Sequence, residues 1–195
     1  MALRKILTKG DEQLAKHCRP VEKFDDRLHV LIDDMRETLE NSGGVGLAAP
    51  QIGILRLVVV LLDINKDPEE MVELVNPEVI EQRGAERVVE GCLSVPGVYG
   101  YVTRPTWAKI RAQDRYGNWF EREGEGVVAQ CFCHETEHLD GADWISAMSA
   151  RAAPVKFTLH RASRPCPPVM LCRKRPCRKS LATNYSEAAK LSKKL

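Results

Sequence analysis

The chain has 195 residues, of which 44% are hydrophobic and 29% are charged, with a formal net charge of +2. These proportions are typical of globular proteins and exclude a disordered or membrane-embedded chain. No apolar run approaches the ~20 residues that a membrane-spanning helix needs, and the first residues lack the apolar stretch of a secretory signal. We therefore expect a cytoplasmic protein with one main domain.

Charge is distributed unevenly along the chain. Residues 161–195 contain ten Lys and Arg and a single acid, Glu187, so this segment carries +9 and the rest of the chain carries −7. Five prolines between residues 154 and 176 interrupt helical periodicity in the same region. We predict a folded domain over residues 1–150 and a poorly ordered basic tail, containing prolines and cysteines, over residues 151–195.

The seven cysteines are irregularly spaced, and their number is odd. In a chain without a secretory signal, this argues against a disulfide framework and favours reduced thiols, some of them metal ligands. Cys166, Cys172 and Cys177 in the tail have no histidine at the spacing of a zinc finger. We therefore expect no second metal site in the tail.

The first helix and the strands are predicted from hydrophobic spacing. Residues 25–40 carry apolar side chains at helical spacing and predict an amphipathic helix that ends at Gly43-Gly44. Residues 55–64 are a β-branched and leucine-rich run of strand length. Shorter strands are expected at residues 71–75, 79–83, 108–112 and 119–122, the last two joined as a hairpin by residues 114–118.

A second helix is predicted over residues 126–139, where apolar residues at mixed spacing indicate burial on most sides. Helix, strands and helix follow one another without the β-α-β alternation of parallel sheets, which indicates the α+β class. We expect mixed β-sheets packed around this central helix, which carries the His134–His138 segment. The amphipathic helix is the N-terminal helix of the fold.

The strongest local signal lies on the central helix, in His134-Glu135-Thr136-Glu137-His138. Residues four apart share one helix face, so both imidazoles can bind one metal ion, and Glu135 can turn toward a water molecule on that ion. The spacing also arises by chance, on a surface helix with two unconnected histidines. A catalytic metal site usually has three protein ligands, so a further donor is needed.

Two upstream segments supply further candidates. Cys92, in a Glu-Gly-Cys-Leu-Ser run, would bind Fe²⁺ or Zn²⁺ as a thiolate, although a lone cysteine in a loop is often a small buried apolar residue. The only later histidine, His160, lies in the proline-rich segment and is a poor mount for a ligand. The glycine-rich residues 44–53 would let backbone approach a bound peptide, with the Gln51 amide as an oriented donor; a plain tight turn is the alternative.

In this order and at these intervals, the three segments resemble the signature motifs of the peptide deformylase family, Gly-x-Gly-x-Ala-Ala-x-Gln, Glu-Gly-Cys-Leu-Ser and His-Glu-x-Asp-His. The resemblance extends over about residues 6–141. It implies that Cys92, His134 and His138 bind one divalent metal. The family's metal is usually Fe²⁺, with Zn²⁺ or Ni²⁺ as substitutes, and the ligands alone do not choose among them.

The implied activity is hydrolysis of the N-formyl group from the formylmethionine of nascent polypeptides, with release of formate. By resemblance, Glu135 is the acid/base, and the Gln51 side chain and the Leu93 backbone N–H stabilise the oxyanion. The peptide backbone is expected to pair in strand fashion with Val45-Gly46 and the Gly97 region. The methionine pocket is expected to be lined by Val45, Tyr99, Val127 and Cys131.

The sequence departs from the family pattern at two motif positions. Glu137 stands where the family usually has Asp, and Cys133 stands where it commonly has Gln. The longer Glu137 side chain is expected to brace His138 or neighbouring backbone from a shifted position, which bears on metal affinity. Glu90 and Arg104 form either an ion pair that braces the loop after Glu90 or a solvated surface pair.

Two alternative functions are open on the sequence alone. A zinc endopeptidase of the His-Glu-x-x-His type would need a third ligand downstream, and an inactive relative would bind nascent chains or ribosomes through the basic tail. For a deformylase, the expected partners are formylmethionyl nascent peptides and the ribosome, the latter through the tail. We expect a monomer that binds neither membranes nor specific DNA.

Overall fold

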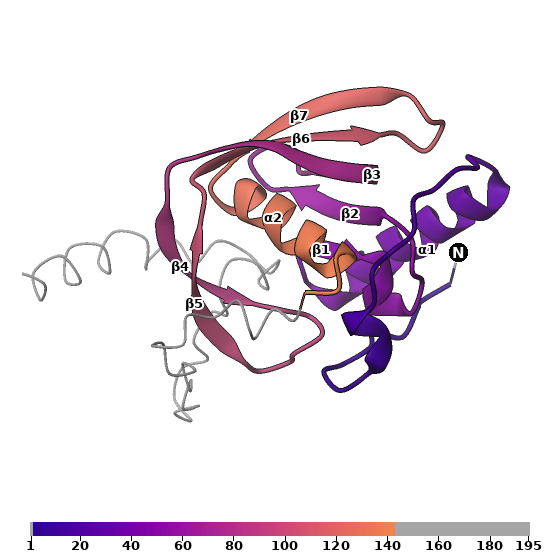
Figure 1. Ribbon diagram of the computed structural model, residues 1–195, viewed down its shortest axis with the longest axis horizontal. Coiled ribbons are helices and arrows are strands. Elements are labelled where there is room, and N and C mark those ends of the chain that lie inside the picture. The colour runs from indigo at the N-terminus through magenta and orange to yellow at the C-terminus, as the bar shows by residue number, and fades with distance from the viewer. Residues whose placement is uncertain (1, 143–195) are drawn as a thin grey trace, which may run out of the picture.

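A computed structural model describes residues 2–142 (Figure 1). The tail predicted over residues 151–195 lies outside the described residues. No helix within residues 2–142 combines the length and the apolarity that crossing a membrane requires. In chain order the elements are η1 (Glu12–Ala15), α1 (Asp26–Ser42), β1 (Gly46–Ala48), η2 (Ala49–Ile52), β2 (Val58–Asp63), β3 (Glu70–Arg83), β4 (Glu86–Gly91), β5 (Tyr99–Arg104), β6 (Trp107–Gln113), β7 (Trp119–Glu125) and α2 (Val127–Leu139).

Helix α1 covers the amphipathic segment predicted at residues 25–40 and continues to Ser42. The Asp25 side chain caps it by accepting hydrogen bonds from two N–H groups of the first turn, and the left-handed Gly43 ends it. Two polar side chains, Asp34 and Thr38, are buried in α1 although apolar periodicity gives no sign of them. Its buried apolar side chains pack in one core with β1 and β2: Leu28, Ile32, Met35 and Leu39.

Five strands form an antiparallel sheet in the order β1-β2-β3-β6-β7, and β4 pairs with β5 in a separate two-stranded sheet. β3 joins the halves of the larger sheet, since its residues 70–75 pair with β2 and its residues 75–83 pair with β6. The sequence predicts two strands here, but the chain continues through a register shift at Asn76, which has a positive φ of 49°. The Asn76 N–H donates to the Leu57 carbonyl at 2.8 Å, so the interruption is a bulge and does not end the strand.

Strand β2 is buried on both faces because α1 and α2 lie on opposite sides of it (Figure 1). Val59 and Leu61 pack in the core that contains α2, while Val58 and Val60 pack in the core that contains α1. Burial on both faces explains the continuous apolar run from which the strand is predicted. Strand β6 instead keeps the predicted alternation, with one face buried and the other partly exposed.

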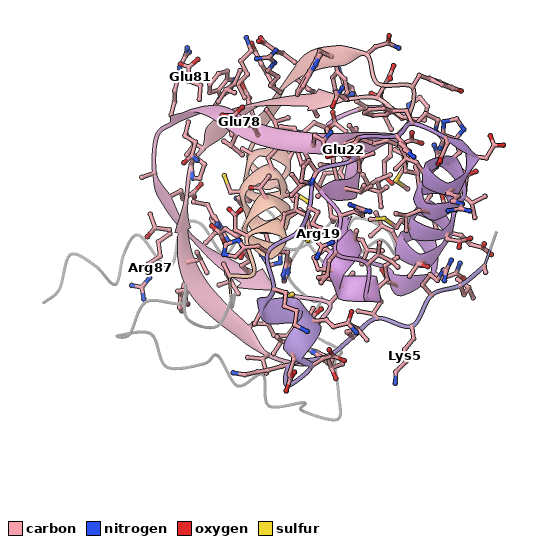
Figure 2. All side chains as sticks on the ribbon, turned by 45° about the vertical axis from the view of Figure 1, so that its right-hand side comes forward. Lys5, Arg19, Glu22, Glu78, Glu81 and Arg87 are labelled. Atoms are coloured by element: carbon pink, nitrogen blue, oxygen red, sulfur yellow. The ribbon has the colours of Figure 1, made fainter. Side chains whose placement is uncertain are left out.

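The β4–β5 pair closes α2 on the side away from the main sheet (Figure 1). These two strands are not predicted from the sequence, because glycine and charged residues interrupt their apolar pattern. Arg87 of β4 points outward and stacks on Tyr101 of β5, with 4.5 Å between its guanidinium carbon and the ring centroid (Figure 2). Because β4 pairs with β5, the loop that connects them, residues 92–98, lies next to the second half of α2.

Strand β7 approaches α2 closely at Gly124. A Cβ atom there would lie 2.6 Å from a Val128 carbon and 2.8 Å from a Phe132 ring carbon. We predict that Gly124→Ala lowers the free energy of unfolding by about 1–3 kcal/mol, because Phe132 is fully buried and has no room to move aside. Urea denaturation measures the change, with the exposed Glu123→Ala on the same strand as the control. Equal midpoints for the two variants would contradict the clash.

Candidate metal centre

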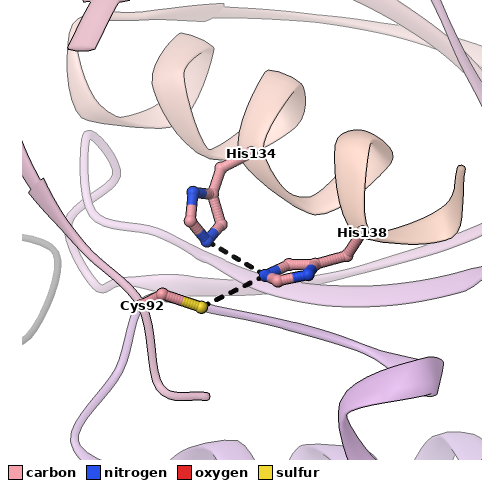
Figure 3. Close-up of side chains that lie close together, drawn as sticks. All are labelled: Cys92, His134 and His138. Carbon is pink, nitrogen blue, oxygen red and sulfur yellow. Dashed lines mark hydrogen bonds between the residues drawn. The ribbon is translucent and has the colours of Figure 1, made fainter. Parts of the chain in front are cut away.

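Helix α2 carries the two imidazoles of the predicted metal site (Figure 3). His134 and His138 lie one helical turn apart, and their Nε2 atoms are 3.2 Å from each other. The apolar side chains of α2, with Phe132 fully buried, pack against the main sheet. The histidines therefore lie on the side of the helix that meets the end of β4.

Strand β4 brings Cys92 to the same point. Cys92 follows Gly91, the last residue of β4, and its Sγ atom lies 3.2 Å from Nε2 of His138. The Cys92 sulfur and one nitrogen of each histidine all lie within 4.8 Å of one another, and all three residues are buried (Figure 3). The structure thus brings the three predicted ligands together from segments more than forty residues apart.

The donor set fits a divalent transition metal. In a tetrahedral site with bonds of about 2.0–2.3 Å, ligand atoms lie roughly 3.3–3.6 Å apart. The two separations of 3.2 Å between Cys92, His134 and His138 are close to that range. Burial lowers the pKa of His138 to about 3, so its imidazole is neutral and keeps a lone pair for a metal. One thiolate and two imidazoles suit Zn²⁺ and Fe²⁺.

Glu90 orients His134 from the side opposite the cluster. Its Oε1 lies 2.7 Å from Nδ1 of His134, which leaves Nε2 directed at the other two donors. Arg104 donates two hydrogen bonds of 2.8 Å to the same carboxylate. The Glu90 and Arg104 side chains are 0% and 4% exposed, so they form a buried ion pair and not a solvated surface pair. Burial by itself raises the pKa of Glu90, but the hydrogen bonds from Arg104 and His134 outweigh it and lower the pKa to about 2.

Glu137 joins this network through Arg104. Its carboxylate accepts two hydrogen bonds from the Arg104 guanidinium, one of them at 2.9 Å. The expected contact of Glu137 with His138 or nearby backbone is not among the hydrogen bonds of residues 2–142. Neighbouring residues on a helix point about 100° apart, so Glu137 faces β5 while His138 faces the cluster. Glu137 therefore reaches the histidines only through Arg104 and Glu90.

Glu135 lies between the two histidines in the sequence, and its side chain is buried. Its Oε2 has no hydrogen-bond partner within residues 2–142. Burial raises the pKa of Glu135 to about 7, which suits a group that gains and loses a proton near neutral pH. Gly46 of β1 packs on this carboxylate. A Cβ atom at position 46 would collide with the Glu135 carboxylate and lie 2.5 Å from Sγ of Cys131. The structure thus brings Gly46 and Cys131, two predicted substrate-binding residues, against the predicted acid/base.

Gln51 and Leu93, the predicted oxyanion donors, flank Cys92. The buried Gln51 accepts the Ala48 N–H at Oε1, with a distance of 2.8 Å, and this contact fixes the orientation of its amide. Its Nε2 lies 3.2 Å from Oγ of Ser94 and 3.7 Å from Sγ of Cys92. The Leu93 N–H has no hydrogen-bond partner in the described part of the chain. Both N–H donors therefore lie next to the thiol.

The remaining predicted substrate-binding residues occupy different elements. Val45 is buried in the core against which Val127 packs. Tyr99 begins β5, and Gly97 lies exposed in the loop before it. The methionine pocket that they would line stays a prediction.

A cavity of about 290 Å³ opens beside Cys92 and His138. Residues 9–12, 14 and 15 form one of its walls, and Ser94 and Val95 lie beside Cys92 in its lining. Nothing in the sequence of residues 9–15 signals this placement, because the segment has neither a motif nor apolar periodicity. The sequence does not single out Ser94 as a site residue, although it ends the Glu-Gly-Cys-Leu-Ser motif, because its hydroxyl has no role in the chemistry that the motif predicts.

Comparisons with known proteins agree with this geometry. The model of the polypeptide deformylase family matches residues 3–153. A peptide deformylase of Caldicellulosiruptor bescii is 53% identical over 141 residues, which cover 72% of this chain and 82% of that protein. A peptide deformylase of Agathobacter rectalis is 49% identical over 157 residues, which cover 80% of this chain and 97% of that protein.

Solved structures give the same result and confirm the α+β class. A peptide deformylase from Legionella pneumophila superposes with a TM-score of 0.72 at 45% identity, covering 76% of this chain and 88% of that one. A peptide deformylase from Thermotoga maritima has a TM-score of 0.72 at 37% identity, covering 76% and 99%. Neither the endopeptidase nor the inactive relative finds support in these comparisons. The chain therefore belongs to the peptide deformylase family, whose members are metal-dependent hydrolases that act on the formyl amide of nascent peptides.

Proposed function

We propose that this chain removes the N-formyl group from the formylmethionine of nascent polypeptides, acting as a monomer in the cytoplasm. The observation that carries the proposal is the convergence of Cys92, His134 and His138 beside the buried Glu135. A thiol and two imidazoles directed at one point, next to a carboxylate with an unpartnered oxygen, are the parts that metal-assisted hydrolysis of an amide requires.

Cys92, His134 and His138 would hold one divalent metal, with Fe²⁺ as the first choice and Zn²⁺ or Ni²⁺ as substitutes. A metal bound there supplies Lewis acidity, which polarises the formyl carbonyl and makes water a nucleophile at neutral pH. Glu90 supports this role because its hydrogen bond to Nδ1 fixes the ring of His134 and leaves Nε2 for the metal.

Glu135 moves the protons of the reaction. It accepts a proton from water as the water oxygen bonds to the formyl carbon, and it gives that proton to the amide nitrogen as the C–N bond breaks. The products are formic acid and the free amine of the N-terminal methionine, and the acidic proton of the former passes to the latter. A carboxyl with a pKa of about 7 serves both as base and as acid near neutral pH.

The Gln51 amide and the Leu93 N–H stabilise the oxyanion that forms on the formyl group. Both lie beside Cys92, and the hydrogen bond from Ala48 holds the Gln51 amide in one orientation. Donors fixed before the reaction need no reorganisation in the transition state, and each is typically worth about 3–4 kcal/mol of barrier.

The peptide is bound by backbone pairing with Val45-Gly46 and the Gly97 region, and its methionine side chain by an apolar pocket. This assignment is supported by the packing of Gly46 and Cys131 against Glu135. The other pocket residues are Val45, Tyr99 and Val127. The +9 charge of residues 161–195 is suited to ribosomal RNA, which would hold the enzyme where nascent chains emerge.

Replacing Glu135 tests the proton transfer. We predict that Glu135→Gln, which keeps the size of the side chain, lowers kcat for formate release from a formyl-Met dipeptide by about 10²–10⁴-fold. Metal content, measured anaerobically on the same preparation, stays at one per chain because the three ligands are intact. Turnover close to that of the unchanged enzyme, with metal in place, would sink the role of Glu135.

Replacing Cys92 tests the third ligand. We predict that Cys92→Ala loses bound metal under anaerobic purification, because two imidazoles alone hold a divalent metal weakly. Cys133→Ala is the matched control, since Cys133 of α2 is a buried free cysteine like Cys92 but does not belong to the donor cluster. Retention of stoichiometric metal by Cys92→Ala, or its loss by Cys133→Ala, would show that the ligand assignment is wrong.

The network behind His134 predicts a graded effect on metal affinity. Glu90→Gln is expected to weaken binding by about 10–100-fold, because it removes the charged partner of His134 and leaves Arg104 short of a buried counter-charge. Glu137→Gln is expected to do less, since the Glu137 side chain is 37% exposed and, within residues 2–142, bonds to Arg104 alone. Competition with a chelator measures both constants. An effect of Glu137→Gln as large as that of Glu90→Gln would contradict this order.

A further inference from the structure

Residues 2–9, named here the strap, cross α1 and continue to the metal centre. At the α1 end the strap is held by polar contacts. The Ala2 N–H donates to Oδ1 of Asp34 at 2.6 Å, and the Arg4 N–H donates to Oγ1 of Thr38 at 3.0 Å. The Arg4 guanidinium adds contacts of 2.9 and 2.6 Å to Oδ2 of Asp34. Asp34 and Thr38, two buried polar side chains of α1, therefore anchor the strap by hydrogen bonds.

At its other end the strap bonds to two loops of the metal centre. The Leu7 N–H donates to the Gln51 carbonyl at 2.7 Å, and the Lys9 N–H donates to the Ser94 carbonyl at 2.8 Å. Only Thr8 lies between the two donors, so the strap fixes the distance between the two carbonyls. The Gln51 side chain spans the same gap with its 3.2 Å contact to Oγ of Ser94.

The strap also shares a core with the residues it positions. Ile6 and Leu93 both pack against the core cluster formed by α1, β1 and β2. Lys5, in contrast, extends away from the protein (Figure 2). The strap therefore contacts the loops through its backbone and shares a core with Leu93 through Ile6, while the charged Lys5 side chain points away from the protein.

Asp34 is a buried charge that the proposed reaction does not use. Its side chain is 3% exposed, and burial by itself raises the pKa of its carboxyl. The hydrogen bonds from Ala2 and Arg4 outweigh burial and hold the pKa below the ordinary value, so the carboxylate is charged at neutral pH. A buried charge destabilises the fold unless it is paired. For the Asp34 carboxylate, the strap supplies every partner found in the described residues.

We propose that the strap positions the oxyanion donors: Asp34 and Thr38 anchor it on α1, and its Leu7 and Lys9 N–H groups set the spacing between Gln51 and the loop that contains Leu93. Asp34 is then a positioning residue for the reaction, at the opposite end of the strap from the chemistry. The inference rests on the roles proposed above for Gln51 and Leu93.

The test compares two carboxylates of matched surroundings in the full-length, metal-loaded enzyme. Asp34→Asn removes the charge that holds Arg4. Asp63→Asn is the control, because Asp63 is 5% exposed and likewise accepts from one arginine, Arg122, and one backbone N–H. Asp63 makes no contact with the strap, so both variants lose a similar ion pair and only one releases the strap.

We expect Asp34→Asn to lower kcat for formate release about 10-fold, with KM and metal content little changed, because misplaced oxyanion donors weaken only the transition state. Asp63→Asn should keep the kcat of the unchanged enzyme. Hydrogen exchange should be faster at the Leu7 and Lys9 amides in Asp34→Asn alone. Equal kcat values for the two variants, or a rise in KM without a fall in kcat, would overturn the proposal.

A double-mutant cycle separates positioning from simple loss of stability. If Asp34 acts through Gln51, then Asp34→Asn should lower kcat much less in a Gln51→Ala background than in the unchanged enzyme. Losses that multiply would show that Asp34 acts elsewhere and would overturn the strap alone. A Gln51→Ala variant with unchanged kcat would overturn the oxyanion assignment, and the strap proposal with it.

A milder variant covers the case in which Asp34→Asn does not fold. The Arg4 side chain is 45% exposed, so Arg4→Gln loosens the same anchor without leaving a cavity in the core. Thr38→Val removes the acceptor of the Arg4 N–H, together with the hydrogen bond that the Thr38 hydroxyl donates to the Asp34 carbonyl, and keeps the shape of the side chain. The same fall in kcat and the same cycle with Gln51→Ala are expected for both, and their absence counts against the strap.

Discussion

The buried carboxylate of Glu90 is the interaction on which the metal centre depends. It lies at the end of β4, two residues before Cys92, and it bonds to His134 on α2 and to Arg104 on β5. One side chain therefore fixes the three elements that meet at the cluster. Because the Glu90 and Arg104 side chains are both buried, loss of Arg104 would leave the Glu90 charge without its counter-charge, which typically costs about 3–5 kcal/mol. The geometry of the ligands is thus enforced by the cost of any arrangement that breaks this pairing.

The centre also requires backbone to approach α2 more closely than side chains allow. Gly46 lets β1 lie against Cys131 and the Glu135 carboxylate, and Gly124 lets β7 lie against Val128 and Phe132. Helix α2 is therefore held against both edge strands of the main sheet, while His134 and His138 face the end of β4. The Glu135 carboxylate, covered by the backbone at Gly46, is desolvated, and this desolvation raises its pKa.

The parts predicted from the sequence are those with a local signature. Helix α1 and strand β2 follow from apolar spacing within one segment, and the pairing of His134 with His138 follows from the pitch of a helix. Cys92 was reached by chemistry, because two imidazoles require a third donor, and by its motif. Strands β4 and β5 were missed, since their stability comes from pairing with each other and from Glu90 and Arg104, which only the fold brings together. The partner of Glu137 was missed for the same reason.

The strap shows why some of a site leaves no trace in a sequence. Its contacts with Gln51 and Ser94 are made by backbone N–H groups, which every residue except proline carries. Many side chains would serve equally at positions 7 and 9, so no motif arises, and the constraint is only the exclusion of proline. The side chains that do carry information, Asp34 and Thr38, lie about thirty residues away in a helix whose apolar pattern reads correctly without them. Function that rests on distant backbone contacts is therefore visible only once the fold has placed the segments side by side.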